Sequence, residues 1–171
     1  METIYENTGV ATEKEFCQMF AWALPKWIRA GGVIFVTVSV LTLLLAPLVD
    51  DWTFSASSLG LLAGGIYLLL TPKIYGKREY KKRIKIYGEI PPSTTLFYED
   101  HFQVTDIDSS HTLEYRRVKR IGLLKDCITL LTEPGGVVVI LSRKDFTKGD
   151  IAGFHLFLQQ KCPQCKLPSW P

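Results

Sequence analysis

Two long apolar stretches follow each other in the first half of the chain, and they restrict its fold more than any other feature. Residues 30–49 and 52–72 contain no Lys, Arg, Asp, Glu or His, and only Asp50 and Asp51 separate them. A bilayer hydrocarbon core about 30 Å thick needs about 20 helical residues, so each stretch is long enough to span it. Neither stretch has the polar face of a helix on a soluble surface. The sequence therefore predicts a two-helix transmembrane hairpin rather than a buried hairpin of a soluble core.

The charges that flank the hairpin predict its orientation. Lys and Arg are enriched at the cytoplasmic ends of membrane spans. Lys26 and Arg29 precede the first stretch, a dense basic run follows the second, and the charges between them are acidic. We therefore expect a hairpin over residues 28–75, with spans at about 28–48 and 54–74 and both termini in the cytoplasm. The polar, acidic start does not resemble a cleavable signal peptide, so we expect the first span to be retained.

The basic run directly after the second stretch gives residues 73–85 a net charge of +6, whereas the whole chain carries +3. Its basic members are Lys73, Lys77, Arg78, Lys81, Lys82, Arg83 and Lys85. At the inner membrane face each of these side chains can gain about 1 kcal/mol from anionic lipid. A purely orienting role for these charges is an equally good interpretation. Nucleic-acid binding is not expected, because no known binding module accompanies the run.

The segment before the hairpin, residues 1–27, predicts a short amphipathic helix. Thr12 and Glu15 have the spacing of a capping box, and Pro25 is expected to end the helix. Apolar residues recur at helical spacing at Phe16, Phe20, Leu24 and Trp27. We expect this apolar stripe to lie in the lipid headgroup region or to pack on the cytosolic domain. An anchoring role is favoured, and binding of a partner is the alternative.

Small residues recur every four positions in the second stretch, at Ala56, Gly60 and Gly64. Such spacing gives one helix face a flat surface that a neighbouring helix can approach closely. We expect the first span to pack there, and association of two copies through the same face is the alternative.

The second half of the chain has the pattern of a small α+β domain. Residues 76–92 are expected to form a basic juxtamembrane segment and linker, with a helix stop at 88–93. Residues 93–161 form the expected domain, in which a clear turn lies at 133–136. Strands are predicted at residues 94–98, 102–106, 112–116, 121–125, 128–132 and 137–141.

A final helix is predicted over residues 150–161, with Asp150 as its N-cap. The predicted fold class is therefore a membrane protein in which a two-helix transmembrane hairpin precedes an α+β domain. This domain is a bent antiparallel sheet that a C-terminal helix closes.

This order of elements resembles the YcxB-like family of bacterial membrane proteins over roughly residues 20–161. Residues 113–121 (LEYRRVKRI) are similar to a strand of that family, and residues 140–146 (ILSRKDF) to its entry into the last helix. The resemblance implies a cytosolic domain of pleckstrin-homology (PH) type and a multi-pass location in the bacterial inner membrane. It implies no catalytic residues.

Domains of this type often bind phosphoinositides or peptides, which directs attention to the basic side chains of the domain. The candidates for a lipid headgroup site are Arg116, Arg117, Lys119, Arg120, Arg143 and Lys144. Guanidinium groups match phosphate oxygens in geometry. Because neighbouring strand residues point to opposite faces, these side chains are not all expected to converge. A merely solvated basic surface is the alternative.

Cys162 and Cys165 form a CxxC motif in the tail, residues 162–171. Two thiolates at this spacing can bind Zn²⁺, but a structural zinc site needs four ligands, and Cys17 and Cys127 lie far away in sequence. No cofactor is therefore expected. The alternatives are a reduced, disordered tail and a zinc ion shared with a partner chain.

The sequence does not predict an enzyme. His101, His111 and His155 are scattered, and no HExxH, GxSxG or phosphate-binding glycine loop occurs. We expect a non-enzymatic membrane protein whose cytosolic domain binds a protein partner at the bilayer. The alternative is that the domain and the basic run bind anionic lipid headgroups, and homo-oligomers remain open.

Overall fold

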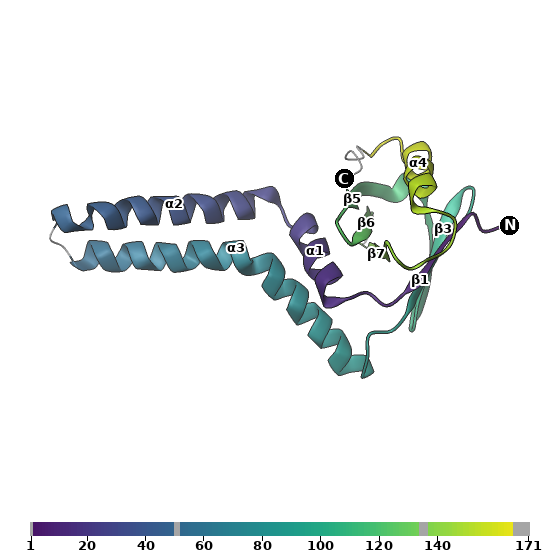
Figure 1. The fold of residues 1–171 in the computed structure, drawn as a ribbon, viewed down its shortest axis with the longest axis horizontal. Coiled ribbons are helices and arrows are strands. Elements are labelled where there is room, and N and C mark those ends of the chain that lie inside the picture. Colours follow the sequence, from purple (N-terminus) through teal and green to yellow (C-terminus); the bar gives the residue numbers. More distant parts are fainter. Residues whose placement is uncertain (1, 50–51, 134–136, 166–171) are drawn as a thin grey trace.

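The computed structural model of the chain describes the backbone of residues 2–49, 52–133 and 137–165. It has a long helical hairpin at one end, a sheet domain at the other, and a short helix between them (Figure 1). The helices are α1 (Glu13–Ala23), α2 (Lys26–Val49), α3 (Trp52–Tyr87) and α4 (Ile151–Lys161). The expected Asp50-Asp51 loop, most of the 133–136 turn and the tail beyond Cys165 lie outside the described residues.

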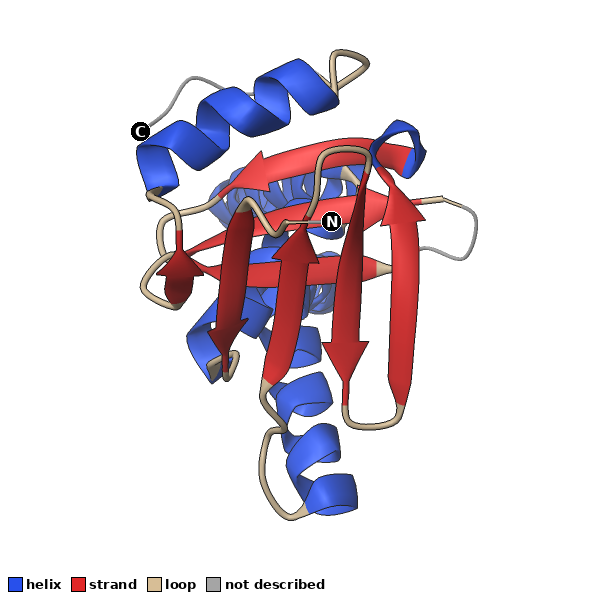
Figure 2. Cartoon of the chain, turned by 90° about the vertical axis from the view of Figure 1, so that its right-hand side faces the viewer, coloured by secondary structure: helices blue, strands red, loops and turns tan. Residues whose placement is uncertain are grey.

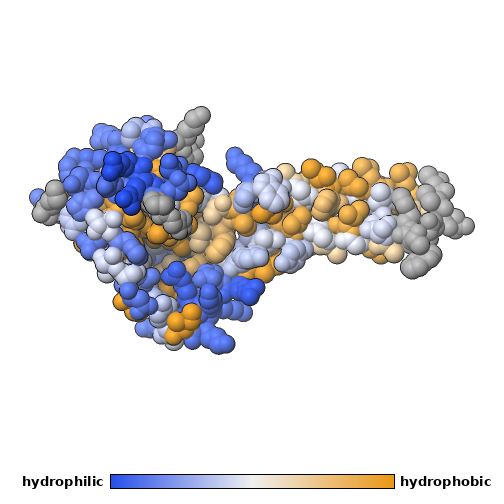
Figure 3. All heavy atoms as spheres, turned by 180° about the vertical axis from the view of Figure 1, so that it is seen from behind, coloured by the Kyte–Doolittle hydropathy of each residue, from blue (hydrophilic) through white to orange (hydrophobic). Residues whose placement is uncertain are grey.

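Helices α2 and α3 form the hairpin, and in the described chain two helices are long and apolar enough to cross a membrane. Figure 3 shows hydrophobic atoms over much of the hairpin surface, in contrast to the largely hydrophilic surface of the sheet domain. This confirms the prediction of two apolar helices ahead of an antiparallel domain.

The two hairpin helices are in close contact at Gly32 and Gly65. A Cβ atom added to Gly65 would lie 2.9 Å from the backbone nitrogen of Val36 and 3.1 Å from the carbonyl oxygen of Gly32. A Cβ on Gly60 or Gly64 would meet no described atom within 4 Å. The prediction that α2 packs on the face of α3 that carries Gly60 and Gly64 was therefore wrong. Consecutive residues point in directions about 100° apart on a helix, so Gly65 and Gly64 lie on different faces.

Helix α3 continues past the apolar part of the hairpin through the basic run. It contains Pro72, and its axis bends between its apolar half and its basic half (Figure 1). A proline inside a helix removes one backbone hydrogen bond and commonly produces such a bend. The expected helix stop is confirmed, because Gly88 has a φ of 81° and its N–H donates to the carbonyl of Ile84 at 2.8 Å.

The described strands form two antiparallel sheets that cross at a large angle (Figure 2). One has the order β4-β3-β2-β1-β8 and the other β5-β6-β7. Helix α4, with the expected Asp150 cap, covers one end of the sheets and buries Phe154, Phe157 and Leu158. The strands are β1 (Tyr5–Gly9), β2 (Ser93–Phe97), β3 (His101–Asp106), β4 (Ser109–Glu114), β5 (Val118–Leu123), β6 (Cys127–Thr132), β7 (Val138–Ser142) and β8 (Phe146–Lys148).

Residues 1–27 were expected to lie outside the sheet domain, but residues Tyr5–Gly9 form strand β1 of its larger sheet. It lies between β2 and β8, with Tyr5 opposite Phe97 and Gly9 opposite Ser93. Asn7 is buried in this strand and donates from Nδ2 to the carbonyl of Ser142 at 2.8 Å. The polar sequence Tyr-Glu-Asn-Thr-Gly has little strand propensity by itself, so long-range pairing decides its conformation.

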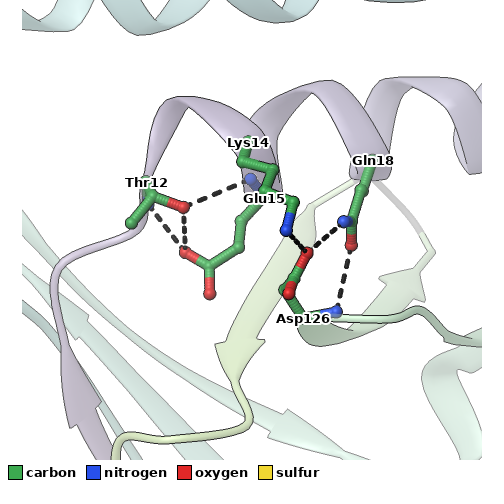
Figure 4. A network of polar contacts seen from close by, with 5 residues as sticks. All are labelled: Thr12, Lys14, Glu15, Gln18 and Asp126. Carbon is green, nitrogen blue, oxygen red and sulfur yellow. Dashed lines mark hydrogen bonds and ion pairs between the residues drawn. The ribbon is translucent and has the colours of Figure 1, made fainter.

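Helix α1 packs between α3 and the sheet domain. The capping box of Thr12 and Glu15 is present as expected. On one side, a Cβ atom added to Gly76 of α3 would lie 2.6 Å from the Cα of Cys17, so the two backbones are in close contact. On the other side, α1 contacts Asp126 in the β5–β6 turn (Figure 4). Of the apolar stripe, Phe16 is buried and contacts Tyr80 of α3, and Phe20 contacts Tyr75, whereas Trp27 lies beyond α1 and is exposed.

Asp126 connects α1 to the sheet domain through several polar contacts (Figure 4). Its carboxylate accepts from Lys14 Nζ at 2.8 Å and from Gln18 Nε2, and its N–H donates to Gln18 Oε1 at 3.2 Å. The hydrogen bond from Lys14, then that from Gln18, lowers the pKa of the Asp126 carboxyl. The ionised carboxylate thus favours the folded protein.

We predict that Asp126→Ala lowers the melting temperature of the full chain by a few degrees at pH 7. A group with a lowered pKa stabilises the fold above its ordinary pKa, about 4, and loses this effect as pH falls through the lowered value. The difference between wild type and variant should therefore shrink at pH 3, as measured by thermal unfolding in neutral detergent. Asp126→Asn is the control that removes the charge and keeps the shape. A difference independent of pH would contradict the role of the charge.

Candidate functional site

A cavity of about 810 Å³ lies where the end of α1, the start of α2 and strand β5 meet. We call it the junction cavity. Its walls are Ala21, Trp22 and Leu24 at the end of α1, Lys26 and Arg29 on α2, residues 119–121 and 123 on β5, and Gln164.

The junction cavity is strongly basic. Lys26 and Arg29 enter it from α2, while Lys119 and Arg120 enter it from β5, and no acidic residue of the described chain lines it. All four residues are exposed, so a ligand can reach their side chains. Like charges gathered around one concavity produce a positive potential that attracts anions.

The two arginines of the cavity also contact the carboxyl end of α1. Arg29 Nη2 donates to the carbonyl of Ala21, and Arg120 Nη2 donates to the carbonyl of Trp22 at 3.3 Å. The last carbonyls of a helix lack intrahelical partners and carry partial negative charge, so cations there are stabilising. The two arginines therefore cap the carboxyl end of α1 whether or not a ligand is bound. A guanidinium has five N–H donors, so each arginine keeps donors for a ligand.

The ring of Trp22 contacts two residues of β5, Arg120 and Gly122. The guanidinium of Arg120 lies over its ring, 4.6 Å from the centroid. A Cβ atom on Gly122 of β5 would lie 2.5 Å from Trp22 Cε2, so only glycine allows the indole to approach the strand this closely. The contact fixes the end of α1 against β5, where the Trp22 ring also contacts Arg120.

The six side chains expected to form a headgroup site do not all converge. Lys119 and Arg120 line the junction cavity. Arg116 and Arg117 lie beside it on the 3-10 turn (Tyr115–Arg117) and share a neighbouring hollow with Lys119 and Glu133. Arg116 pairs with Glu114.

Arg143 and Lys144 lie elsewhere, in a hollow near the other end of α1 that Lys125 and Asp126 also line. The structure thus separates these two from the other four. Alternation along the strands had already indicated that one common site was not expected.

Sequence reasoning missed Lys26 and Arg29 as members of a site, because basic residues before a span are explained by orientation alone. Trp22 was missed as well. The contact between Arg120 and Trp22 joins residues 98 positions apart, and no local pattern indicates it.

The basic run of α3 does not line the junction cavity. Lys77 pairs with Glu13 of α1 at 3.2 Å, and Arg83 lies 3.6 Å from Asp106 and over the ring of Phe16. These two residues therefore help to dock α3 against α1 and the sheet domain. The exposed members of the run are Lys73, Arg78, Lys81, Lys82 and Lys85, together with Lys77.

Cys162 and Cys165 are buried against the sheet domain, so the expectation of a disordered tail was wrong for residues 162–165. Cys165 Sγ donates to the carbonyl of Val118 at 3.3 Å, and Gln164 Nε2 donates to the same carbonyl at 3.0 Å. Burial raises the pKa of Cys162 to about 12 and also raises that of Cys165. The segment therefore packs on the start of β5.

No group of three or more metal-binding side chains occurs in the described part of the chain. A zinc ion that Cys162 and Cys165 share with a partner chain stays a prediction. Such a site would require both buried thiols to become exposed and to lose their protons.

Comparisons of the chain with protein-family models, with curated proteins and with solved structures find no match. The chemistry of the junction cavity is therefore argued from its own residues.

Proposed function

We propose that this protein is a non-enzymatic membrane protein whose junction cavity binds the anionic headgroup of a lipid. In this proposal α2 and the apolar half of α3 span the bilayer, and both termini and the sheet domain lie in the cytoplasm. The crossed antiparallel sheets and the closing helix α4 support a PH-like domain, in line with the resemblance to the YcxB-like family of the bacterial inner membrane.

The observation that carries the proposal is the gathering of four basic side chains, two of them at the very start of α2, around one cavity. If α2 enters the bilayer there, the cavity opens at the depth of the lipid phosphates. Each Lys or Arg near such a surface can gain about 1 kcal/mol from anionic lipid. Trp27 is 72% exposed next to the cavity, which suits an aromatic side chain at a membrane interface.

The remaining walls of the cavity suit the part of a lipid below its phosphate. Trp22, Leu24 and Ile121 contribute apolar surface beside the charged groups. A phosphate can thus contact the basic side chains while the glycerol and upper acyl carbons contact the apolar wall. An oxygen-rich soluble metabolite would leave that wall exposed to water.

A protein partner, which the sequence favoured, is supported by a different surface. Strand β4 pairs with β3 alone among the described strands, and Ser109–Thr112 within it are exposed. An exposed sheet edge can accept an added strand from another protein. The two functions use separate surfaces, so lipid binding at the cavity does not exclude a partner at β4.

The test is lipid binding by the full chain in an uncharged detergent. Calorimetric titration with dioctanoyl phosphatidylglycerol should show binding, and dioctanoyl phosphatidylcholine should show little. Lys26→Ala combined with Lys119→Ala should weaken binding about 30-fold, because two ion pairs of about 1 kcal/mol each are lost.

The matched control is Lys81→Ala combined with Lys82→Ala, which removes the same charge from an exposed part of α3. The control should change the affinity less than threefold. Equal losses in the two double variants would show a general charge effect, and no preference for the anionic lipid would remove the proposed function.

A further inference from the structure

We infer that the junction cavity selects a ligand with two phosphate groups over a ligand with one. This inference rests on the proposed function and specifies the class of headgroup. It follows from the number of charges, their distribution over two walls, and the donors that remain available.

The cavity has more positive charge than one phosphodiester can compensate. Lys26, Arg29, Lys119 and Arg120 contribute four positive charges. The carboxyl end of α1 compensates about half a charge. Lys119 also lies 3.6 Å from Glu133, but both side chains are more than half exposed, so water screens this pair strongly. More than two positive charges remain, and one phosphodiester supplies a single negative charge.

The charges lie on two different walls. Lys26 and Arg29 belong to α2, whereas Lys119 and Arg120 belong to β5, and the cavity of about 810 Å³ lies between them. Such a volume is typical of sites for molecules much larger than one phosphate. A ligand with two phosphates can contact both walls at once, while a single phosphate leaves one wall without a partner.

The donors at both walls are partly oriented before a ligand binds. Arg29 is bonded to Ala21, and Arg120 is bonded to Trp22 and stacked on its ring. Each arginine uses one N–H in these contacts and has four others. Side chains ordered in advance lose less entropy on binding, and guanidinium groups bind phosphate with two parallel hydrogen bonds.

The experiment compares ligands that differ in phosphate number, with the full chain in uncharged detergent. Short-chain diphosphatidylglycerol has two phosphodiesters, and dioctanoyl phosphatidylglycerol has one. We expect the dissociation constant of diphosphatidylglycerol, expressed per phosphate, to be about tenfold lower than that of dioctanoyl phosphatidylglycerol. Lys26→Ala or Lys119→Ala, each of which removes one charge from one wall, should reduce this ratio about fivefold, to about two. The control double variant, Lys81→Ala with Lys82→Ala, should leave this ratio unchanged.

Pyrophosphate and orthophosphate have no acyl chains. Their binding therefore shows whether phosphate groups alone are recognised, and whether the ligand is a lipid or a soluble phosphate compound. Pyrophosphate that binds more tightly than orthophosphate supports selection of two phosphates. If it binds as tightly as the lipid, the source is a soluble phosphate compound. Equal affinity per phosphate for both lipids, with binding still dependent on Lys26 and Lys119, would overturn this inference and leave the proposed function intact. No binding of any anionic lipid would remove both.

Discussion

A fragment of residues 88–171 is expected not to fold, although it contains the whole domain that the sequence pattern delimits, residues 93–161. Strand β1 lies between β2 and β8, so the fragment loses an inner strand of the larger sheet. Tyr5 of that strand contacts the core rings of Phe154 and Phe157, with centroids 5.2 and 5.1 Å apart. Losing a large aromatic side chain from a core costs about 3–5 kcal/mol, and total stabilities are about 5–15 kcal/mol.

The measurement is near-ultraviolet circular dichroism and amide NMR dispersion of the purified fragment. We expect weak aromatic signals and poor dispersion. Addition of a peptide with residues 2–24, which supplies β1 and α1, should restore both. The peptide with Asn7→Asp is the matched control, because it places a charge where Asn7 is buried and donates to Ser142. A native-like spectrum of the fragment alone would show that β1 is dispensable.

Gly76→Leu is expected to separate α1 from α3 and to weaken headgroup binding. The added Cβ would lie 2.6 Å from the Cα and 2.9 Å from the backbone nitrogen of Cys17. These are backbone atoms, so no rotamer change of a side chain relieves the overlap, and α1 must move. The end of α1 forms a wall of the junction cavity, so the cavity should lose its shape as well.

The readout is the rate at which maleimide labels Cys17 in the full chain at pH 7.5, with the labelled site located by mass spectrometry. Burial, followed by the charge of Glu13, raises the pKa of the Cys17 thiol in the packed protein, which keeps the reactive thiolate scarce. Release of α1 should return the pKa toward its ordinary value and increase the labelling rate about tenfold or more. Cys127, Cys162 and Cys165 are buried and serve as internal references.

Gly60→Leu provides a matched control in the same helix. A Cβ atom at Gly60 meets no described atom within 4 Å, so this variant should label at the wild-type rate and bind lipid normally. If Gly76→Leu also behaves as wild type, the close contact between α1 and α3 is not required for the fold or for the site.

Local signals predicted most of the elements. The absence of charge over two long stretches predicted α2 and α3, and the capping patterns at Thr12 and Asp150 predicted the starts of α1 and α4. The six predicted strands are close to β2–β7 except around the 3-10 turn, where β4 ends at Glu114 and β5 begins at Val118, whereas β1 and β8 were not predicted. Tyr115 is buried there and donates to the carbonyl of Tyr98 at 2.7 Å, and the chain changes from one sheet to the other.

The apolar hairpin, the capped helices and the antiparallel domain were predictable from local patterns, because each depends on hydrophobic periodicity or on hydrogen bonds between near neighbours. Three features could be seen only in the folded protein: Tyr5–Gly9 is an inner strand, Gly65 faces α2, and Arg29 and Arg120 each donate to a carbonyl at the end of α1. These three features depend on contacts between residues that are distant along the chain. Local propensity is nearly neutral at such positions. The pairing of β1 and the contact at Gly65 are therefore decided by packing, and the positions of the two arginines by the last carbonyls of α1, which lack intrahelical donors.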